Sequence, residues 1–452
     1  MTLKFGTDGV RGVANQELTP ELVVALGRAA AEVLGGTTFL LGRDTRVSGP
    51  LLQAALSAGL ASEGVSVVDL GVLPTPGVAF ASAMRGNPAA VISASHNPFP
   101  DNGIKLFAAG GRKLPDDVEE VLESRLTQVL GGVGGLPGSS APTGESVGRL
   151  DTDGGALDEY VTHLVGSLEG RRLDHLRVVL DCANGAAFEA APRALVALGA
   201  EVEVMGHRPD GTNINDGCGS TFPMALQRAV VTAGADVGLA LDGDADRVLA
   251  VDGQGGLVDG DQLLALCAQD LRSRGRLRED TVVVTVMTNL GFRHAMSAQG
   301  IAVQETAVGD RYVLEALERG GWSLGGEQSG HLIFRELATT GDGTLTGLML
   351  LDLLRRHGRP LAELAAEAMT RLPQVLRNVR LAVRDPDVVA RLRPAIEAAE
   401  AELDGEGRVL VRASGTEPLV RVMVEAPTEQ QAEEAVARLV ADVERTCGVA
   451  PA

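Results

Sequence analysis

The sequence predicts an α/β protein with three related α/β domains and a smaller α+β domain at the C-terminal end. Through most of the 452-residue chain, β-branched strand-like runs alternate with segments of helical period, which is the pattern of doubly wound α/β units. One helix–glycine–strand unit recurs three times. Beyond residue 371 the predicted order changes to strand, helix, hairpin and helix, so we expect the last domain to be of a different kind.

The first helix is predicted at residues 19–34. Thr19 is a favourable N-cap residue, and Pro20 stands in the first turn, where its missing N–H costs nothing. The apolar face of this helix consists of Leu22, Val23, Leu26, Ala30 and Val33. Three more elements follow, namely a strand at 37–42, a helix near 50–62 and a strand at 65–71.

The recurring unit consists of a helix end, a glycine, a β-branched strand and a closing glycine. It appears as "LASEGVSVVDLG", "LVALGAEVEVMG" and "MSAQGIAVQETAVG", with glycines at 64, 199 and 300. The spacings are unequal (199 − 64 = 135 and 300 − 199 = 101 residues), whereas a solenoid repeats at a fixed short period. We therefore expect three separate α/β domains of related build.

Changes in composition indicate the domain boundaries. Residues 131–148, "GGVGGLPGSSAPTGESVG", are rich in Gly, Ser and Pro and lack periodicity, as in a loop or linker. Further boundaries are predicted near 252–256 and 369–379. The predicted domains are 1–150, 151–253, 254–370 and 371–452.

The last domain contains the strands "GRVLVR" and "LVRVMVEA" on either side of the loop "ASGTEP". Its closing helix starts at "APTEQQAEEAVARLVADV", where Thr428 and Gln431 have the spacing of a capping box. These features predict a hairpin followed by a well-defined helix.

Composition narrows the possible partners and the compartment. The 60 Asp and Glu residues against 40 Lys and Arg give a net charge of −20, which argues against nucleic acid or an anionic membrane as the partner. A phosphorylated substrate would then need local clusters of positive charge. The four cysteines lack CxxC spacing, and we find neither a signal segment nor a membrane-length apolar run. We therefore expect a soluble cytoplasmic protein with reduced thiols.

The segment 91–107, "VISASHNPFPDNGIKLF", passes from an apolar strand into a polar loop. Ser95 and His96 are sequence neighbours, which is poor geometry for a catalytic Ser–His pair, and no GxSxG elbow surrounds Ser95. A serine hydrolase is therefore disfavoured. A serine that carries phosphate would need a metal, cations and an acid or base nearby. Lys105, one of only three lysines in the chain, is a candidate for one of those cations.

The segment "LDGDADRVLAVD" places Asp242, Asp244 and Asp246 at every second position. In an extended chain the three carboxylates lie on one side, where they repel one another unless a cation such as Mg²⁺ is bound. Arg247 can offset the remaining negative charge or hold a phosphate oxygen. The alternative is a solvated acidic turn without a metal.

The segment "WSLGGEQSGHLIF" has the same plan of an apolar strand followed by a glycine-rich turn. Glu327, Ser329 and His331 then alternate. A carboxylate beside a hydroxyl suits hydrogen bonds to sugar hydroxyls or to an amine. Taken alone this segment is also compatible with an ordinary turn.

The segment "VRASGTEPLVRV" indicates an anion site. Small residues let backbone N–H groups point into a concavity, and hydroxyl and guanidinium groups can complete the site. The candidate residues are Arg412, Ser414, Gly415, Thr416 and Arg421. The alternative is a hairpin loop with ordinary Ser and Thr.

Taken together, seven motifs resemble those of the α-D-phosphohexomutase superfamily. They occur in one order over essentially the whole chain: "FGTDGVRG" at 5–12, "ISASHNPFPDNGIK" at 92–105, "GTNINDGCGS" at 211–220, "DGDADR" at 242–247, "VGDRYV" at 308–313, "GEQSGH" at 326–331 and "RASGTEP" at 412–418. The ordered set is highly specific, although any single motif is not. Gln328 favours the glucosamine-directed branch, because glucose- and mannose-directed relatives usually carry another residue there.

The resemblance implies three α/β domains and a smaller C-terminal domain around a central active-site cleft. It also implies an isomerase that interconverts glucosamine 6-phosphate and glucosamine 1-phosphate, on the route to UDP-N-acetylglucosamine and the cell wall. Phosphorylated Ser95 would donate its phosphate to the sugar, and the bisphosphorylated sugar would turn round and return its other phosphate. Glucosamine 1,6-bisphosphate, or another hexose bisphosphate, is thus the implied intermediate and activator.

The resemblance further implies a role for each candidate residue. Mg²⁺ would be bound by Asp242, Asp244, Asp246 and a phosphoserine oxygen of Ser95. The candidates for proton transfer or charge neutralisation are Lys105 and His331, with Arg11 and Arg247 near the transferred phosphate. The sugar hydroxyls would be held by Glu327 and Ser329, and the other phosphate by Arg412, Ser414, Gly415, Thr416 and Arg421.

Other functions are compatible with the same residues. The nearest is a phosphomannomutase or phosphoglucomutase with the same mechanism and another sugar. A Mg²⁺-dependent sugar phosphatase would release free phosphate without a bisphosphate activator, and a non-catalytic sugar-phosphate sensor would keep its binding after Ser95→Ala. The sequence leaves the oligomeric state open between monomer and homodimer.

Overall fold

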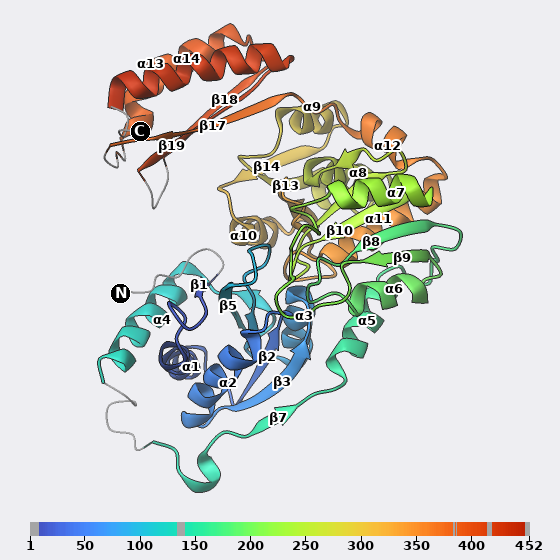
Figure 1. Cartoon of the computed structure of the whole chain (residues 1–452). Helices are drawn as coiled ribbons and strands as arrows, with labels where there is room; N and C mark the ends of the chain where they lie inside the picture. Colours follow the sequence, from blue (N-terminus) through green and yellow to red (C-terminus); the bar gives the residue numbers. More distant parts are fainter. Residues whose placement is uncertain (1–8, 133–140, 383–384, 386, 414–417, 448–452) are drawn as a thin grey trace. The chain divides into compact units, whose positions relative to one another are not determined.

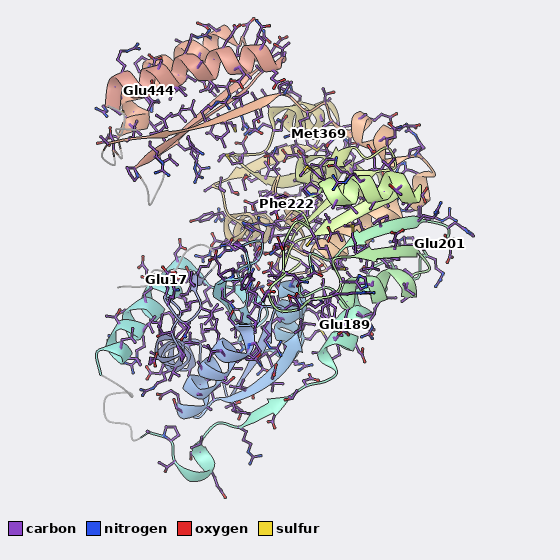
Figure 2. All side chains as sticks on the ribbon, in the orientation of Figure 1. Glu17, Glu189, Glu201, Phe222, Met369 and Glu444 are labelled. Atoms are coloured by element: carbon purple, nitrogen blue, oxygen red, sulfur yellow. The ribbon has the colours of Figure 1, made fainter. Side chains whose placement is uncertain are left out.

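The computed structural model describes residues 9–132, 141–382, 385, 387–413 and 418–447 (Figure 1). The chain forms two compact units. The larger unit comprises Met1–Met287 and Ile301–Ala368, and the smaller one comprises Thr288–Gly300 and Met369–Ala452. Within the described ranges, no helix is both long and apolar enough to cross a membrane. The surface carries many acidic side chains, among them the exposed Glu17, Glu189 and Glu201 (Figure 2).

The larger unit begins with a seven-stranded sheet of order β1-β5-β4-β2-β3-β7, with β6 paired to β5. Its strands are β1 Val10–Val13, β2 Thr38–Arg43, β3 Ser66–Val72, β4 Ala89–Ile92, β5 Asp101–Ala108, β6 Arg112–Lys113 and β7 Leu150–Thr152, and its helices are α1 Pro20–Leu34, α2 Gly49–Ser62, α3 Thr75–Arg85 and α4 Asp116–Leu130. One face of the sheet packs against α1, α2 and α4 in a single hydrophobic core. The opposite face meets α3, because Gly42 of β2 lies against Val78 of that helix.

The helix predicted at 19–34 is confirmed as α1. The hydroxyl of Thr19 accepts a hydrogen bond from the N–H of Leu22 at 3.3 Å, and Pro20 is the first helical residue. Helices α1 and α2 approach closely where two glycines meet. A Cβ atom on Gly27 would lie 2.5 Å from the carbonyl oxygen of Leu56, and one on Gly59 would lie 2.2 Å from that of Val24.

Two further sheets complete the larger unit. The second sheet, of order β12-β11-β10-β8-β9, contains β8 Arg177–Asp181, β9 Glu201–Met205, β10 Val237–Leu241, β11 Val248–Asp252 and β12 Leu257–Val258, with helices α5 Ala156–Gly166, α6 Ala190–Ala197 and α7 Met224–Ala233. The third sheet, of order β14-β13-β15-β16, contains β13 Thr281–Thr285, β14 Ala302–Thr306, β15 Leu324–Gly326 and β16 Leu332–Phe334, with helices α8 Gly260–Ser273, α10 Asp310–Gly320, α11 Gly343–His357 and α12 Leu361–Ala368. We call the chain segments around these sheets the first, second and third domains.

The predicted relationship between the three domains is confirmed by their strand order. Each has a parallel pair (β2 with β3, β8 with β9, β13 with β14), a third parallel strand and then an antiparallel strand. The recurring glycines Gly64, Gly199 and Gly300 have φ values of 85°, 94° and 66° and each stands shortly before β3, β9 or β14. A left-handed turn into the same strand therefore explains the glycine in the repeated pattern.

The segment 131–148 lies partly outside the described residues. Its described part contains a short 3₁₀ turn, η1 Gly144–Ser146, and the N–H of Gly148 donates a hydrogen bond to the carbonyl of Ala61. The next strand, β7, pairs with β3. The described end of this segment thus packs on the first domain as an ordered loop.

The smaller unit has the predicted order of strand, helix, hairpin and helix. Its elements are β17 Gln374–Arg380, α13 Val388–Glu402, β18 Arg408–Ala413, β19 Leu419–Glu425 and α14 Glu429–Cys447, together with α9 Leu290–Ala298. The antiparallel sheet has the order β17-β19-β18, and α13 and α14 pack against one of its faces in a separate core. The hydroxyl of Thr428 accepts the N–H of Gln431 at 3.3 Å, as the capping pattern predicted.

Candidate active site

Three of the predicted site loops occupy equivalent positions in the three related domains. Each loop connects the third parallel strand to the antiparallel strand that follows it. The β4–β5 loop carries Ser95, the β10–β11 loop carries Asp242, and the β15–β16 loop carries His331. The repeated domain plan therefore explains why three segments of similar sequence pattern each carry polar residues at the same place.

Ser95 is buried and has a left-handed backbone with φ of 51°. Its hydroxyl donates a hydrogen bond of 2.6 Å to Oδ2 of Asp242 and lies 3.2 Å from Nδ1 of His96. A left-handed conformation is unusual for a residue with a side chain and is commonest where function requires a particular direction. In this case it directs the hydroxyl toward the acidic loop of the second domain.

The carboxylates of the three aspartates lie close together, but the backbone conformation that brings them together is not the expected one. One carboxylate oxygen from each of Asp242, Asp244 and Asp246 lies within 4.8 Å of the others, and all three side chains are buried. The segment is a turn between β10 and β11 and is not an extended strand, so the expectation of strand alternation is wrong. Ala245 has a φ of 56°, and this left-handed residue folds the loop so that its carboxylates meet.

The carboxylate cluster fits a hard divalent cation. Burial and the neighbouring charges of Asp246 and Asp244 raise the pKa of Asp242 well above its usual range, because three crowded anions repel one another in the absence of a cation. Oδ1 of Asp244 and Oδ1 of Asp246 are buried, and neither has a hydrogen-bond partner among the described residues. Carboxylate oxygens are the ligands that Mg²⁺ prefers in proteins. Oδ1 of Asp244 is available for such an ion, and Oδ1 of Asp246 lies 3.7 Å from Nε of Arg247.

Lys105 extends from β5 into the same cluster. Its buried ammonium group lies 2.8 Å from Oδ2 of Asp244 and 3.3 Å from Oδ2 of Asp246. The hydroxyl of Thr75 also donates to Oδ2 of Asp244, at 2.7 Å. Burial by itself would raise the pKa of Asp244, but the charge and hydrogen bond of Lys105 outweigh it and hold that pKa below its usual range.

Two arginines add positive charge around the serine loop. Nη1 of Arg247 lies 3.4 Å from Nδ1 of His96. Burial lowers the pKa of His96, and the charges of Arg247 and Arg11 lower it further. His96 is therefore neutral at pH 7, and the positive charge here belongs to the two arginines.

The loop of the third domain is held against the second. Gly330 has a φ of 90°, and its carbonyl accepts the N–H of Val248 at 3.1 Å. A Cβ atom on Gly330 would lie 2.1 Å from the carbonyl oxygen of Val248, so this contact requires glycine. Glu327 is half-buried, and its carboxylate accepts the N–H of Gly309 at 3.1 Å, while Ser329 is exposed.

His331 belongs to a buried charged group that sequence reasoning did not find. Its Nε2 lies 3.1 Å from Oδ2 of Asp310, which also forms an ion pair with Lys113. Burial tends to lower the pKa of His331, but Asp310 raises it above its usual value. The ring lies against Gly341, where a Cβ atom would be 2.4 Å away. The scarcity of lysine, used here for Lys105, would have pointed to Lys113 as well.

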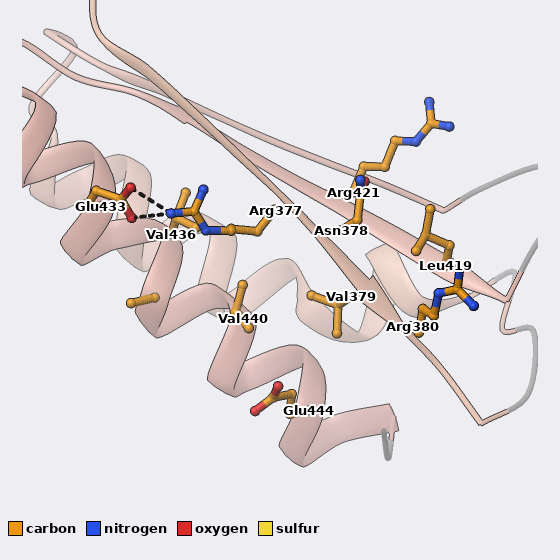
Figure 3. Close-up of a pocket in the computed structure, with 11 residues that line it drawn as sticks. Arg377, Asn378, Val379, Arg380, Leu419, Arg421, Glu433, Val436, Val440 and Glu444 are labelled. Carbon is orange, nitrogen blue, oxygen red and sulfur yellow. Dashed lines mark hydrogen bonds and ion pairs between the residues drawn. The ribbon is translucent and has the colours of Figure 1, made fainter. Parts of the chain in front are cut away.

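In the smaller unit, Arg421 pairs across the sheet with Arg412 on one side and Asn378 on the other. These residues alternate with the valines that pack against the helices, so they share the face that turns away from α13 and α14. Figure 3 shows Arg421 and Asn378 side by side, whereas Arg377 turns toward Glu433 of α14. A pocket of about 710 Å³ lies along β17, β19 and α14. Ser414, Gly415 and Thr416 lie outside the described residues.

Comparison with known proteins agrees with this arrangement. Models of the phosphoglucomutase/phosphomannomutase family match the chain in four consecutive parts. These are alpha/beta/alpha domain I at residues 2–130, domain II at 158–256, domain III at 259–372 and the C-terminal domain at 376–442. The chain belongs to this family.

Curated relatives within this family are similar to the chain over nearly its whole length. It is 55% identical to the phosphoglucosamine mutase of Frankia alni, over 98% of each chain. It is 53% identical to the phosphoglucosamine mutase of Desulforudis audaxviator, again over 98% of each chain. The likeness therefore extends over all four domains.

Solved structures of the family share the fold. A phosphoglucomutase/phosphomannomutase family protein from Burkholderia thailandensis superposes with a TM-score of 0.82 at 26% identity, over 99% of each chain. N-acetylphosphoglucosamine mutase from Aspergillus fumigatus superposes with a TM-score of 0.67 at 20% identity, over 99% of this chain and 96% of that one. The second likeness concerns the fold alone.

Proposed function

We propose that the protein is a phosphoglucosamine mutase, which interconverts glucosamine 6-phosphate and glucosamine 1-phosphate. One observation carries the proposal. The hydroxyl of Ser95 is held 2.6 Å from Asp242, inside a buried cluster of three carboxylates and Lys105. Relatives at 52–55% identity that bear the name phosphoglucosamine mutase support the choice of sugar.

The reaction consists of two phosphate transfers. In the first, the P–Oγ bond of phosphorylated Ser95 breaks and a bond forms between phosphorus and a sugar oxygen. The hydroxyl proton of the sugar passes to a base, and the Ser95 oxygen that leaves the phosphorus takes up a proton and becomes a free hydroxyl. In the second transfer the bisphosphorylated sugar, bound the other way round, returns its other phosphate to Ser95. The sugar leaves with its phosphate moved, and the enzyme is again phosphorylated.

The chain's own cations are placed to stabilise this transfer. Positive charge near the transferred group lowers the barrier because negative charge accumulates on its oxygens. Lys105 supplies that charge beside Asp244, and Arg247 supplies it beside His96, on which the charge of Arg11 also acts. Asp310 raises the pKa of His331 above its usual value and so favours its charged form, and we assign His331 proton donation or charge neutralisation.

The three aspartates and an oxygen of phosphorylated Ser95 would hold Mg²⁺. When bound, such an ion withdraws negative charge from the phosphate and so acts as a Lewis acid. The left-handed turn at Ala245 keeps the three carboxylates together.

Substrate recognition is assigned to two groups of residues. Glu327 and Ser329 would contact the sugar, and the carboxylate of Glu327 suits the 2-ammonium group of glucosamine. The phosphate that is not being transferred is assigned to Arg412, Ser414, Gly415, Thr416 and Arg421. A bisphosphate such as glucosamine 1,6-bisphosphate would load Ser95 at the start.

The test compares kcat/KM for glucosamine 6-phosphate, glucose 6-phosphate and mannose 6-phosphate, with a hexose 1,6-bisphosphate as activator. We expect glucosamine 6-phosphate to be preferred, and Glu327→Gln to reduce that preference by about 10- to 100-fold, the range for one charged hydrogen bond. A preference for glucose or mannose would instead indicate a phosphoglucomutase or phosphomannomutase. Release of free phosphate at the rate of turnover would indicate a phosphatase.

A further inference from the structure

Arg46 is a fully buried arginine whose side chain contacts the backbone of the serine loop. Its Nη2 donates to the carbonyls of Ser95 at 3.0 Å and Asn97 at 2.9 Å, and its Nη1 donates to the carbonyl of Pro98 at 2.6 Å. Its Nε pairs with Asp44 at 2.8 Å, where both side chains are fully buried. One guanidinium group thus donates to three backbone carbonyls of the serine loop, those of residues 95, 97 and 98.

Asn215, from the second domain, reaches the same two carbonyls from the other side. Its Nδ2 donates to the carbonyl of Ser95 at 2.8 Å and to that of Asn97 at 3.2 Å. The backbone of the aspartate loop closes over this point, because a Cβ atom on Gly243 would lie 2.5 Å from the Ser95 carbonyl oxygen. The Ser95 carbonyl is therefore held by one donor from each of two domains.

The remaining polar groups of the loop form a chain that returns to Arg46. The N–H of Ser95 donates to the hydroxyl of Ser93 at 3.0 Å, and that hydroxyl donates to Oδ2 of Asp44 at 2.6 Å. Asp44 in turn accepts both the backbone N–H and the Nε of Arg46. The N–H and the carbonyl of Ser95 are both hydrogen-bonded to side chains. These hydrogen bonds stabilise the left-handed backbone conformation of Ser95, with its φ of 51°.

We propose that Arg46 and Asn215 are positioning residues for phosphate transfer, which hold Ser95 in the backbone conformation that directs its hydroxyl at the aspartate cluster. The inference rests on the proposed role of Ser95 as the phosphate carrier. Neither residue needs to touch the substrate. Asn215 belongs to the second domain, which also carries the aspartate loop. One hydrogen-bond network therefore positions both the Ser95 hydroxyl and the proposed metal ligands.

The test uses the full-length variants Asn215→Ala and Arg46→Lys, with Asn213→Ala as the matched control. Asn213 lies two residues away, and its side-chain amide donates to the carbonyl of Arg208 within its own loop. For each protein we would measure the rate of phosphate uptake from glucose 1,6-bisphosphate by intact mass, kcat and KM for glucosamine 6-phosphate, and the thermal midpoint.

We expect Asn215→Ala to lower both phosphate uptake and kcat by about 10²-fold, as a misplaced reacting group does, with KM near the wild-type value. Arg46→Lys keeps the charge but not the forked donors, so its kcat falls at least as far. Asn213→Ala keeps wild-type uptake.

Three results would overturn the inference. The first is wild-type uptake and kcat in Asn215→Ala, which decides the matter even if Arg46→Lys does not fold. The second is a raised KM with unchanged kcat, which would indicate substrate binding instead. The third is an equal loss of activity and thermal midpoint in Asn215→Ala and Asn213→Ala, which would indicate a role in stability alone. If wild-type protein takes up no phosphate, the proposed function itself fails and the inference fails with it.

Discussion

The hydroxyl of Ser95 donates a 2.6 Å hydrogen bond to Asp242, although the two residues are 147 positions apart in the sequence. The contact joins equivalent loops of two related domains, and Lys105 reaches the same cluster from the strand that follows Ser95. A chain of related α/β domains can bring a serine hydroxyl and a carboxylate cluster together in this way, because each domain presents the same loop.

Asp242→Asn is expected to weaken Mg²⁺ binding, because it removes one of three charged ligands. Loss of a group that hydrogen-bonds to a metal ligand lowers metal affinity by about 10- to 100-fold. Loss of a ligand itself should cost more, so the Mg²⁺ concentration for half-maximal activity should rise by more than this. Without Mg²⁺ the variant should melt at a higher temperature than wild type, since buried repulsion is relieved. Asp252→Asn, at the far end of β11, is the control. An unchanged Mg²⁺ requirement in Asp242→Asn would rule out the metal assignment.

Lys105→Met should destabilise the metal-free protein, because it leaves the buried carboxylate of Asp244 without its cation. We expect the free energy of unfolding to fall by about 3 kcal/mol, as for other broken buried ion pairs. The double variant Lys105→Met/Asp244→Asn should recover part of the loss, since both charges are then absent. Urea denaturation with EDTA measures the two single variants, Lys105→Met and Asp244→Asn, and the double variant. Additive losses in the double variant would contradict this account.

Arg421→Ala should raise KM for glucosamine 6-phosphate by about 10- to 100-fold, the range for a lost charged hydrogen bond. Asn378→Ala should raise it by less, because a neutral amide binds phosphate more weakly than a guanidinium group. Arg377→Ala is the control, since this neighbour of Asn378 pairs with Glu433 on the opposite face. Steady-state kinetics would contradict the assignment if Arg377→Ala raised KM as much as Arg421→Ala.

The buried carboxyl group of Asp342 leads to a prediction of how the stability of the protein depends on pH. Burial raises its pKa to about 6, and its carboxylate accepts the hydroxyl of Tyr160 and the N–H of Leu345, both at 2.8 Å. The pKa of Asp342 is higher in the folded state than in the unfolded state. Between roughly pH 4 and 6 the native state therefore keeps a proton on Asp342, whereas the unfolded state has lost it. The contribution of Asp342 to stability is therefore present at acid pH and is lost as pH rises through that window.

Asp342→Asn removes this titration while keeping an N-cap acceptor for α11. From pH 4 to pH 7, approximately, wild type should lose on the order of 3 kcal/mol relative to the variant, the value of a shift of about two pKa units. Urea denaturation of both proteins with EDTA measures the difference. A difference that stays constant over this range would show that Asp342 does not titrate there.

Elements with local signals were predictable from the sequence. Thr19 and Pro20 indicate the start of α1, and the glycine before each β-branched strand indicates a repeated turn, so the build of the related domains followed from pattern alone. Local pattern failed at the aspartate loop, where alternation suggested a strand. The left-handed residue Ala245 makes a turn instead, and a residue with a side chain carries no clear signal for that conformation.

Residues whose roles depend on distant contacts were not predictable. Lys113 and Asp310 form an ion pair 197 positions apart, and Asn215 reaches the carbonyl of Ser95 over 120 positions. Arg46 follows β2 and the serine loop follows β4, and the two lie close together because these strands are neighbours in the sheet. Asn215 and Asp310 lie within two of the quoted motifs, but no motif shows which residues contact each other, because the three-dimensional fold alone brings the partners together.

The most direct test is the intact mass of wild type and Ser95→Ala before and after incubation with glucose 1,6-bisphosphate, with turnover of glucosamine 6-phosphate measured in parallel. The account predicts that wild type gains one phosphate, located on Ser95, and that Ser95→Ala gains none and has no activity above background. Isomerisation by Ser95→Ala at the wild-type rate would contradict it.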